Sequence, residues 1–209
     1  MFTSLTAFPS EREVILKERA SQSYRLSAYF MAKTTADAPV RLILPLLYMI
    51  VSFWMAGISS SVGIFLGTTG CTLLSVLSGE AIGLCLGAAV YDLQKGLTIM
   101  TVFTLFLMLL GGFFVDNVPV FIEWGKFLSP FKYAFDSSLQ LVFNKDLPCD
   151  DDGVLGDLCV DGFASAGDVL DFIGVQGSVA FNVGMLLLLG FVPRYFAYLA
   201  LRMQKDSER

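Results

Sequence analysis

Four long apolar runs constrain the fold of this 209-residue chain more than any other feature. They cover residues 42–61, 62–79, 97–115 and 175–192, and none of them contains a charged residue. A helix needs roughly 20 mostly apolar residues to cross a bilayer, because its backbone must hydrogen-bond internally in hydrocarbon. A soluble domain has about 25% charged residues, whereas this chain has 16%, too few to cover four such helices in water. The runs therefore predict an all-α membrane protein with four transmembrane helices.

Basic residues indicate which side of the membrane each connection faces. Lysine and arginine gather before the first run and after the last, and Lys95 lies between the second and third runs. The acidic segment between the third and fourth runs has only Lys126, Lys132 and Lys145 as basic residues. Because an excess of lysine and arginine marks the cytoplasmic side, we expect a multi-pass protein with both termini in the cytoplasm, in the plasma membrane or an internal membrane.

Shorter patterns between the runs predict two further helical regions. Residues 10–23 read as an amphipathic helix on the cytoplasmic surface, because Ser10 and Glu13 have the spacing of a capping box. This helix is either a solvated linker or a docking surface for a cytosolic partner. Residues 117–143 are too polar to span a bilayer and too apolar for a free loop, which favours an external re-entrant helical hairpin buried against protein.

These patterns divide the chain into consecutive segments. With their interfacial residues, the predicted spans cover 24–58, 60–91, 96–115 and 173–202. The last two segments are an external acidic loop over 144–172 and a cytoplasmic tail over 203–209.

Glu80 and Arg41 are ionisable residues within or beside the apolar runs. Glu80 lies between Gly79 and Gly83, in a stretch whose glycines let a neighbouring helix approach closely. An ionisable group at that depth is costly and should face protein or water rather than lipid. Glu80 therefore either hydrogen-bonds to another helix or takes part in a substrate or proton path. We expect Arg41 to extend its side chain to the inner interface, with a role in transport as the alternative.

The four cysteines divide into two pairs by position. Cys71 and Cys85 lie in the second span, where they are expected to be small packing residues. Cys149 and Cys159 lie in the acidic loop predicted to be external, where an oxidising compartment permits a disulfide. Closing this short loop would stabilise it by roughly 2–3 kcal/mol. Two free thiols and a bridge between subunits are the alternatives.

Several kinds of chemistry are excluded by the residues that the sequence lacks. The chain has no histidine, which removes the commonest general base and metal ligand. It also has no GxxxxGK(S/T) phosphate loop and no GxGxxG motif. Residues 150–152 are three aspartates, and a solvated acidic loop is favoured there over a loose calcium site. With no basic patch, nucleic-acid binding has no support. We expect no catalytic residue, no metal and no cofactor in this chain.

Four stretches of the sequence carry a resemblance to a known family. They are MFTSLTAFPSER at 1–12, ERASQSYRLSAYF at 18–30, the residues Asp37-Ala-Pro39 with Trp54-Met-Ala-Gly57, and Gly111-Gly-Phe-Phe-Val115. In order and spacing they resemble the G subfamily of ABC transporters, the white/brown-complex half-transporters, and especially its plant-like members. The resemblance covers essentially the whole chain. The first two stretches are specific to this family, whereas the glycine and aromatic pieces alone would be weak.

The resemblance implies a role for the predicted cytoplasmic helix. Residues 10–23 would be the family's coupling helix, which rests on a nucleotide-binding domain and passes its motion to the membrane. Residues 1–9 would be the tail of a preceding span, and the four predicted spans would be the family's third to sixth. The charged residues that would make the contact with the nucleotide-binding domain are Glu11, Arg12, Glu18 and Arg19.

The resemblance also implies a substrate cavity at a two-fold interface with another half-transporter. Leu105, Met108 and Leu109 would line this cavity. Phe113 and Phe114 would occupy the apolar gate above it. Ordinary helix packing is the alternative interpretation of these five residues.

The family's nucleotide-binding domain, its first span and most of its second have no counterpart in this sequence, so we expect a fragment or a shortened form. The implied function is the transmembrane portion of an ATP-driven exporter of hydrophobic or amphipathic small molecules. The chain itself would not be an enzyme, since ATP and Mg²⁺ would bind in a nucleotide-binding domain outside it. Its partners would be the bilayer, a second half-transporter in a homo- or heterodimer, that domain and the substrate. The alternative is a truncated, non-transporting subunit that dimerises with full-length half-transporters and regulates them.

Overall fold

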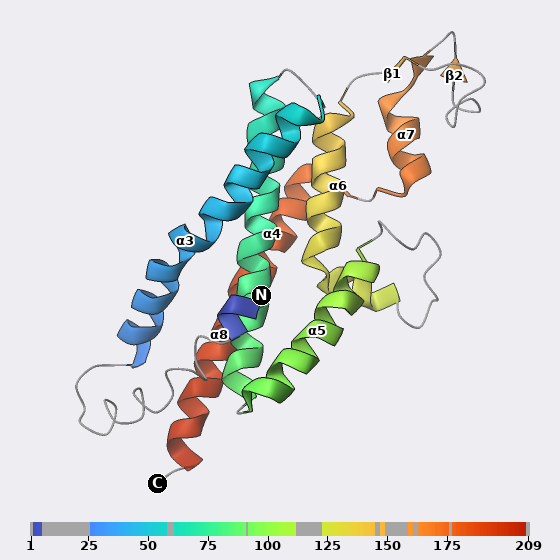
Figure 1. Ribbon diagram of the computed structural model, residues 1–209. Coiled ribbons are helices and arrows are strands. Elements are labelled where there is room, and N and C mark those ends of the chain that lie inside the picture. Colours follow the sequence, from blue (N-terminus) through green and yellow to red (C-terminus); the bar gives the residue numbers. More distant parts are fainter. Residues whose placement is uncertain are drawn as a thin grey trace.

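The structure, a computed structural model, describes residues 2–5, 26–57, 61–90, 92–111, 123–144, 147–148, 159–160, 163–175 and 177–207 (Figure 1). Helices dominate this part of the chain. In chain order the elements are α1 (Phe2–Leu5), α3 (Leu26–Met55), α4 (Val62–Ala89), α5 (Leu93–Leu109), the 3-10 helix η1 (Glu123–Leu128), α6 (Pro130–Val142), the strands β1 (Leu147–Pro148), β2 (Cys159–Val160) and β3 (Phe163–Ala164), α7 (Ala166–Ile173) and α8 (Val179–Ser207).

Three of the described helices are long and apolar enough to cross a membrane. The apolar stretches are Phe30–Met55 in α3, Val62–Ala89 in α4 and Val179–Arg202 in α8. They end within about three residues of the predicted spans, but the first and last begin about six residues later than predicted. The first and last carry internal prolines, which long apolar helices tolerate when neighbouring groups satisfy the freed carbonyls.

The third predicted span differs from the structure at both ends, because α5 has only 17 residues. At a rise of 1.5 Å per residue such a helix is about 25 Å long, shorter than the roughly 30 Å of bilayer hydrocarbon. The helix ends in a tight turn, in which the Gly111 amide donates to the Met108 carbonyl at 3.1 Å. The buried hydroxyl of Ser129, just before α6, donates to the Leu107 carbonyl at 2.8 Å and satisfies it.

Helix α4 lies at the centre of the described fold and contacts α1, α3, α5, α6 and α8 (Figure 1). Within its apolar window 56% of the residues are buried, against 6% for α3 and 22% for α8. Small residues permit this burial. Gly67 leaves room for the Leu141 side chain of α6, and the Ser78 hydroxyl donates to the Leu186 carbonyl of α8 at 2.7 Å. The pair α4–α8 is therefore closely packed, whereas α3 is largely uncovered.

The segment predicted to be a re-entrant hairpin forms η1 and α6 within the described residues. Pro130 occupies the first turn of α6, where its missing N–H costs nothing. Helix α6 packs against α4 and α8, and its Tyr133 is buried in a cluster with Leu186 and Leu189. The depth of η1 and α6 in a bilayer stays a prediction.

The predicted acidic loop over 144–172 contains regular structure, so the all-α prediction is incomplete. Three two-residue strands form an antiparallel sheet in the order β1-β3-β2, with Leu147 opposite Ala164 and Cys159 also opposite Ala164. Helix α7 follows and is capped by Gly174, whose φ of 78° is the left-handed conformation that glycine adopts without strain. The strands were missed because two-residue strands have no detectable alternation of apolar and polar residues.

Candidate functional site

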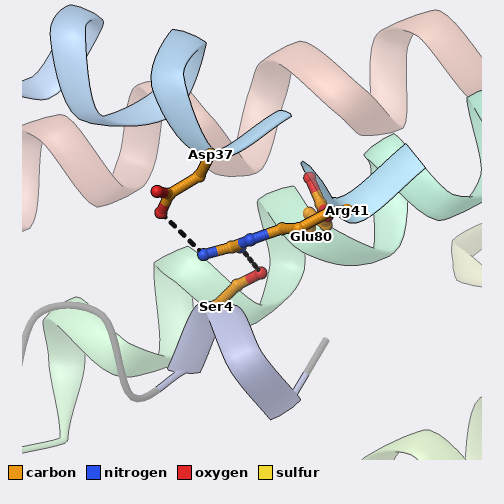
Figure 2. A network of polar contacts seen from close by, with 4 residues as sticks. All are labelled: Ser4, Asp37, Arg41 and Glu80. Atoms are coloured by element: carbon orange, nitrogen blue, oxygen red, sulfur yellow. Dashed lines mark hydrogen bonds and ion pairs between the residues drawn. The ribbon is translucent and has the colours of Figure 1, made fainter. Parts of the chain in front are cut away.

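Arg41 of α3 is the centre of a polar network that joins three helices (Figure 2). Its Nη2 atom lies 2.8 Å from Asp37 Oδ2, one turn earlier on the same helix. Its Nη1 atom donates to the hydroxyl of Ser4 in α1. Its Nε atom lies 3.9 Å from Oε1 of Glu80 in α4. All three guanidinium nitrogens therefore face a polar group on α1, α3 or α4.

The network is largely shielded from the surroundings. The exposed fraction of the side chain is 17% for Arg41 and 6% for Glu80, and Ser4 is fully buried. The expectation that Arg41 extends to the inner interface stays a prediction. An unpaired charge in apolar surroundings is costly, and the two carboxylates and the hydroxyl give the guanidinium polar partners within the described helices.

Local sequence explains how α3 presents this arginine. Asp37 and Arg41 are four residues apart and so lie on one face of the helix. Pro39 lies between them, and Pro45 follows one turn after Arg41. Because Pro45 has no N–H, the Arg41 carbonyl lacks its usual helical donor. The most polar part of α3 is therefore also the part where prolines remove backbone hydrogen bonds of the helix.

Helix α1 is held against α4 and α5 next to the network. Leu5 is 1% exposed, and its carbonyl carbon and oxygen lie directly over Gly87 of α4. A Cβ built on Gly96 of α5 would touch the Leu5 side chain at 3.6 Å. Ser4 is thereby placed beside Arg41. The described elements on either side of residues 6–25, α1 and α3, thus meet at one guanidinium.

Arg194 of α8 adds a second cation near the network. Glu80 interacts electrostatically with Arg194 as well as with Arg41. The Nε atom of Arg194 is buried and has no hydrogen-bond partner within the described part of the chain. The charge of Glu80 is thus stabilised by arginines that come from two different helices.

The residues predicted to line a substrate cavity lie on an uncovered face of α5. Leu105, Met108 and Leu109 are 55%, 42% and 50% exposed, whereas Met100 and Leu107 on the other face are fully buried. The spacing of three and four residues places the first three side by side. Their role in a cavity stays a prediction.

The other predicted site residues lie outside the described residues or are described only in part. Outside are the charged residues of the coupling helix, Glu11, Arg12, Glu18 and Arg19, the gate residues Phe113 and Phe114, and Cys149. Cys159 is placed by its backbone in β2, so the disulfide stays a prediction. Cys71 and Cys85 are free thiols within α4.

Sequence reasoning identified Glu80 but missed the partners of Arg41. The four-residue spacing of Asp37 and Arg41 was a visible signal of an ion pair within one helix. The contact between Arg41 and Ser4 could not be predicted, because the two residues are 37 positions apart and no sequence motif includes Ser4. Among the described residues, no group of three His, Cys, Asp or Glu side chains could hold a metal ion.

Comparisons with known proteins agree with this architecture. A family model described as ABC-2 type transporter matches residues 1–143. ABC transporter G family member 22 of Arabidopsis thaliana is 37% identical over 205 residues, which are 98% of this chain and 24% of that protein. Member 25 of the same plant is 35% identical over 216 residues, 98% of this chain and 32% of the relative. Protein white of Drosophila melanogaster is 27% identical over 219 residues, 98% of this chain and 30% of the relative. The chain thus spans about a quarter to a third of the length of these relatives.

Proposed function

Because the chain belongs to the ABC-2 type transporter family, as its resemblance to G-family ABC transporters indicated, we propose that it forms transmembrane helices of an ATP-driven exporter. Its cargo would be hydrophobic or amphipathic small molecules. The observation that carries this proposal is the junction at Arg41, where α1 and α3 meet α4. A membrane domain driven from the cytosol needs such a connection between the driven segment and the helices that move.

In the proposed mechanism residues 6–25 receive the motion of a nucleotide-binding domain that lies outside this chain. Both described elements that flank this segment are attached to Arg41, by the Ser4 hydroxyl on one side and by the α3 backbone on the other. A displacement of either element therefore changes the position of the guanidinium relative to Glu80. This chain's residues transmit motion, and ATP hydrolysis takes place elsewhere.

The proposed orientation places both ends of the chain in the cytoplasm. Lys95 is 78% exposed in its side chain and follows the end of α4, and Arg202 is exposed near the end of α8. The excess of basic residues at these connections supports a cytoplasmic location. In this orientation the sheet and α7 lie outside the cell or in a lumen.

The uncovered face of α5 supports a partner in the membrane. Leu105, Met108 and Leu109 expose apolar surface that no described residue covers. We propose that a second half-transporter faces this surface and that the substrate passes between the two. An apolar lining has little power to select among hydrophobic molecules, which fits a cargo defined by hydrophobicity rather than by one functional group.

Split-transporter complementation would test the proposal. The chain is co-expressed with the part of a G-family relative that it does not match, which supplies the nucleotide-binding domain, and inside-out vesicles are assayed for ATP-dependent uptake of a hydrophobic fluorescent compound. We expect uptake only when both parts are present, and no ATP hydrolysis by the purified chain alone. ATP turnover by the chain alone would contradict the assignment. A stable complex that lowers the uptake by a full-length relative, with no uptake of its own, would favour the regulatory alternative.

A further inference from the structure

Three large apolar side chains are exposed where α7 leads into α8. Phe172 and Ile173 at the end of α7 are 64% and 38% exposed, and Phe181 in the first turn of α8 is 54% exposed. Gly177, with a φ of 80°, lies in the connection, and a Cβ on it would be 3.1 Å from the Phe181 ring. Phe172, Ile173 and Phe181 thus form an apolar corner, the α7–α8 corner, that the described residues leave largely uncovered.

Helix α7 is amphipathic. Val169, Phe172 and Ile173 are three and four residues apart, so they lie on one face of the helix. Asp168 and Asp171 lie on another face, and both are exposed. Val169 is 2% exposed, so protein covers the middle of the apolar face and holds the helix in a fixed orientation. The part of this face that stays uncovered is its end, at Phe172 and Ile173.

The α7–α8 corner lies near the level at which α4 and α8 begin and α6 ends. The Gln140 side chain, two residues before the end of α6, donates to the Gly177 carbonyl at 2.8 Å. Leu141 lies over Gly67 in the second turn of α4, and α8 begins at Val179. In Figure 1, α7 lies at the height of α6 and not beyond the ends of the long helices. The end of α7 is therefore level with helices that are long enough to cross a membrane.

The corner also continues an uncovered apolar stripe on α8. Phe181, Leu188 and Tyr195 follow one another at intervals of seven residues, so they lie on one face of the helix. All three side chains are more than half exposed. Because α8 is long and apolar enough to cross a membrane, lipid is the medium that meets such a stripe, and the stripe leads to Phe172 and Ile173.

We propose that α7 is an interfacial helix, with Phe172 and Ile173 inserted into the lipid leaflet at this end of the helices, the outer leaflet in the proposed orientation. Helices of this kind insert an apolar face about 5–10 Å into the boundary between headgroups and acyl chains and keep a polar face in water. Asp168 and Asp171 provide the polar face. Because α7 contains two acids and no base, its partner is a zwitterionic lipid surface and not an anionic one, which attracts basic segments.

Quenching of tryptophan fluorescence by brominated lipid tests the insertion. Phe172→Trp is compared with Asp168→Trp, the control on the polar face, in the full chain in phosphatidylcholine nanodiscs. Both variants also carry Trp54→Phe and Trp124→Phe, so that each has one tryptophan. We expect Phe172→Trp to lose most of its emission when the acyl chains are brominated near the headgroup, and Asp168→Trp to keep its emission.

The outcomes separate lipid from the other ways of covering the corner. An unquenched Phe172→Trp would overturn the proposal, with red-shifted emission indicating water and blue-shifted emission indicating protein, such as a second copy of the chain. Equal quenching of Phe172→Trp and Asp168→Trp would show that α7 does not insert by this face. Replacing part of the phosphatidylcholine by phosphatidylglycerol should weaken the quenching of Phe172→Trp, and stronger quenching would contradict the zwitterionic partner.

A second measurement keeps the native tryptophans, so it remains available if the tryptophan variants do not fold. Amide hydrogen exchange of α7 in nanodiscs is compared for Phe172→Ser and Gly167→Ser, which place the same side chain on the apolar and the polar face. Gly167 has room for it, since the nearest atom to an added Cβ is the Ser165 hydroxyl oxygen at 3.8 Å. Phe172→Ser should speed exchange in the last turn of α7 by about tenfold or more, the scale of removing a phenylalanine from apolar surroundings, and Gly167→Ser should not.

Equal exchange in Phe172→Ser and Gly167→Ser would overturn the insertion. The proposal rests on the chain's location in a membrane and not on export. Because both measurements use this chain alone, without ATP or cargo, they can fail while the complementation assay for export succeeds.

Discussion

The backbone of Leu5 lies so close to Gly87 that a Cβ on this glycine would be 2.5 Å from the Leu5 carbonyl oxygen. This contact holds α1 against α4 at the residue next to Ser4, whose hydroxyl accepts from Arg41. Glycine is required here because two backbones meet, and a backbone cannot move aside as a flexible side chain can. The contact between Leu5 and Gly87 thus fixes where the segment before residue 6 enters the helical bundle.

Gly87→Ala should destabilise the chain by about 1–3 kcal/mol, the usual cost of overpacking. The added methyl group would displace Leu5 and with it Ser4. Gly70→Ala is the matched control, because it lies in the same helix with open space around it and should stabilise the helix by up to about 1 kcal/mol. Thermal unfolding in nanodiscs compares the two. Equal effects of the two substitutions would show that α1 does not dock as described.

Ser129→Ala should loosen the end of α5. Its hydroxyl satisfies the buried carbonyl of Leu107, and leaving a buried acceptor unsatisfied costs about 1–3 kcal/mol. Hydrogen exchange of the last turn of α5 should become faster. Ser165→Ala serves as the control, since that exposed serine precedes α7 without a side-chain capping bond. If exchange at Leu109 and Leu110 is unchanged in Ser129→Ala, the hydroxyl is not the cap of this helix.

The first turn of α5 should lose stability in acid. Asp92 precedes this helix, and its carboxylate accepts from the amides of Gln94 at 3.0 Å and Lys95 at 3.4 Å. Chiefly the hydrogen bond from the Lys95 amide holds the pKa of Asp92 below its ordinary value of 3.8. Because the pKa is lower in the folded state, the carboxylate contributes its stability fully above pH 3.8 and loses it as the pH falls through the lower, folded value.

The measurement for this cap is amide exchange at Gln94 and Lys95 as a function of pH, referred to Thr101 within the same helix. Protection of the two amides should fall below pH 4 in the wild type. Asp92→Asn keeps an acceptor for the cap and should remove the pH dependence. Protection that falls equally in Asp92→Asn would assign the acid sensitivity to another group.

The sequence predicts the long helices well because continuous apolar stretches leave few alternatives. Helix α4 begins and ends within two residues of the predicted limits, 60–91, since its apolar character continues from Val62 to Ala89. The end of α5 could not be predicted in the same way. It depends on the hydroxyl of Ser129, which reaches back to Leu107 from 22 positions further along the chain. The spacing of apolar residues indicates where a helix can form. It does not indicate which distant residue will contact the end of that helix.

In the candidate site, too, a contact within one helix could be predicted, whereas contacts between residues far apart in the sequence could not. The pair Asp37–Arg41 is visible as an i,i+4 spacing, and the cost of burying Glu80 follows from its residue type alone. The direction of the Arg41 side chain depends on Ser4 and Glu80, 37 and 39 positions away. The short sheet had one usable signal: Asp161-Gly162 between β2 and β3 is a pair that favours a two-residue hairpin.

The role of Arg41 is tested by the coupling between ATP hydrolysis and export. The chain is assembled with the nucleotide-binding part of a G-family relative, and the amount of substrate exported per ATP hydrolysed is compared for wild type, Arg41→Gln and the exposed control Arg202→Gln. If Arg41 connects the driven segment to α4, Arg41→Gln should lower this ratio about fivefold or more, the scale of a typical coupling energy, with ATP hydrolysis largely retained and Arg202→Gln close to wild type. An unchanged ratio in Arg41→Gln would contradict the claim that motion passes through this network.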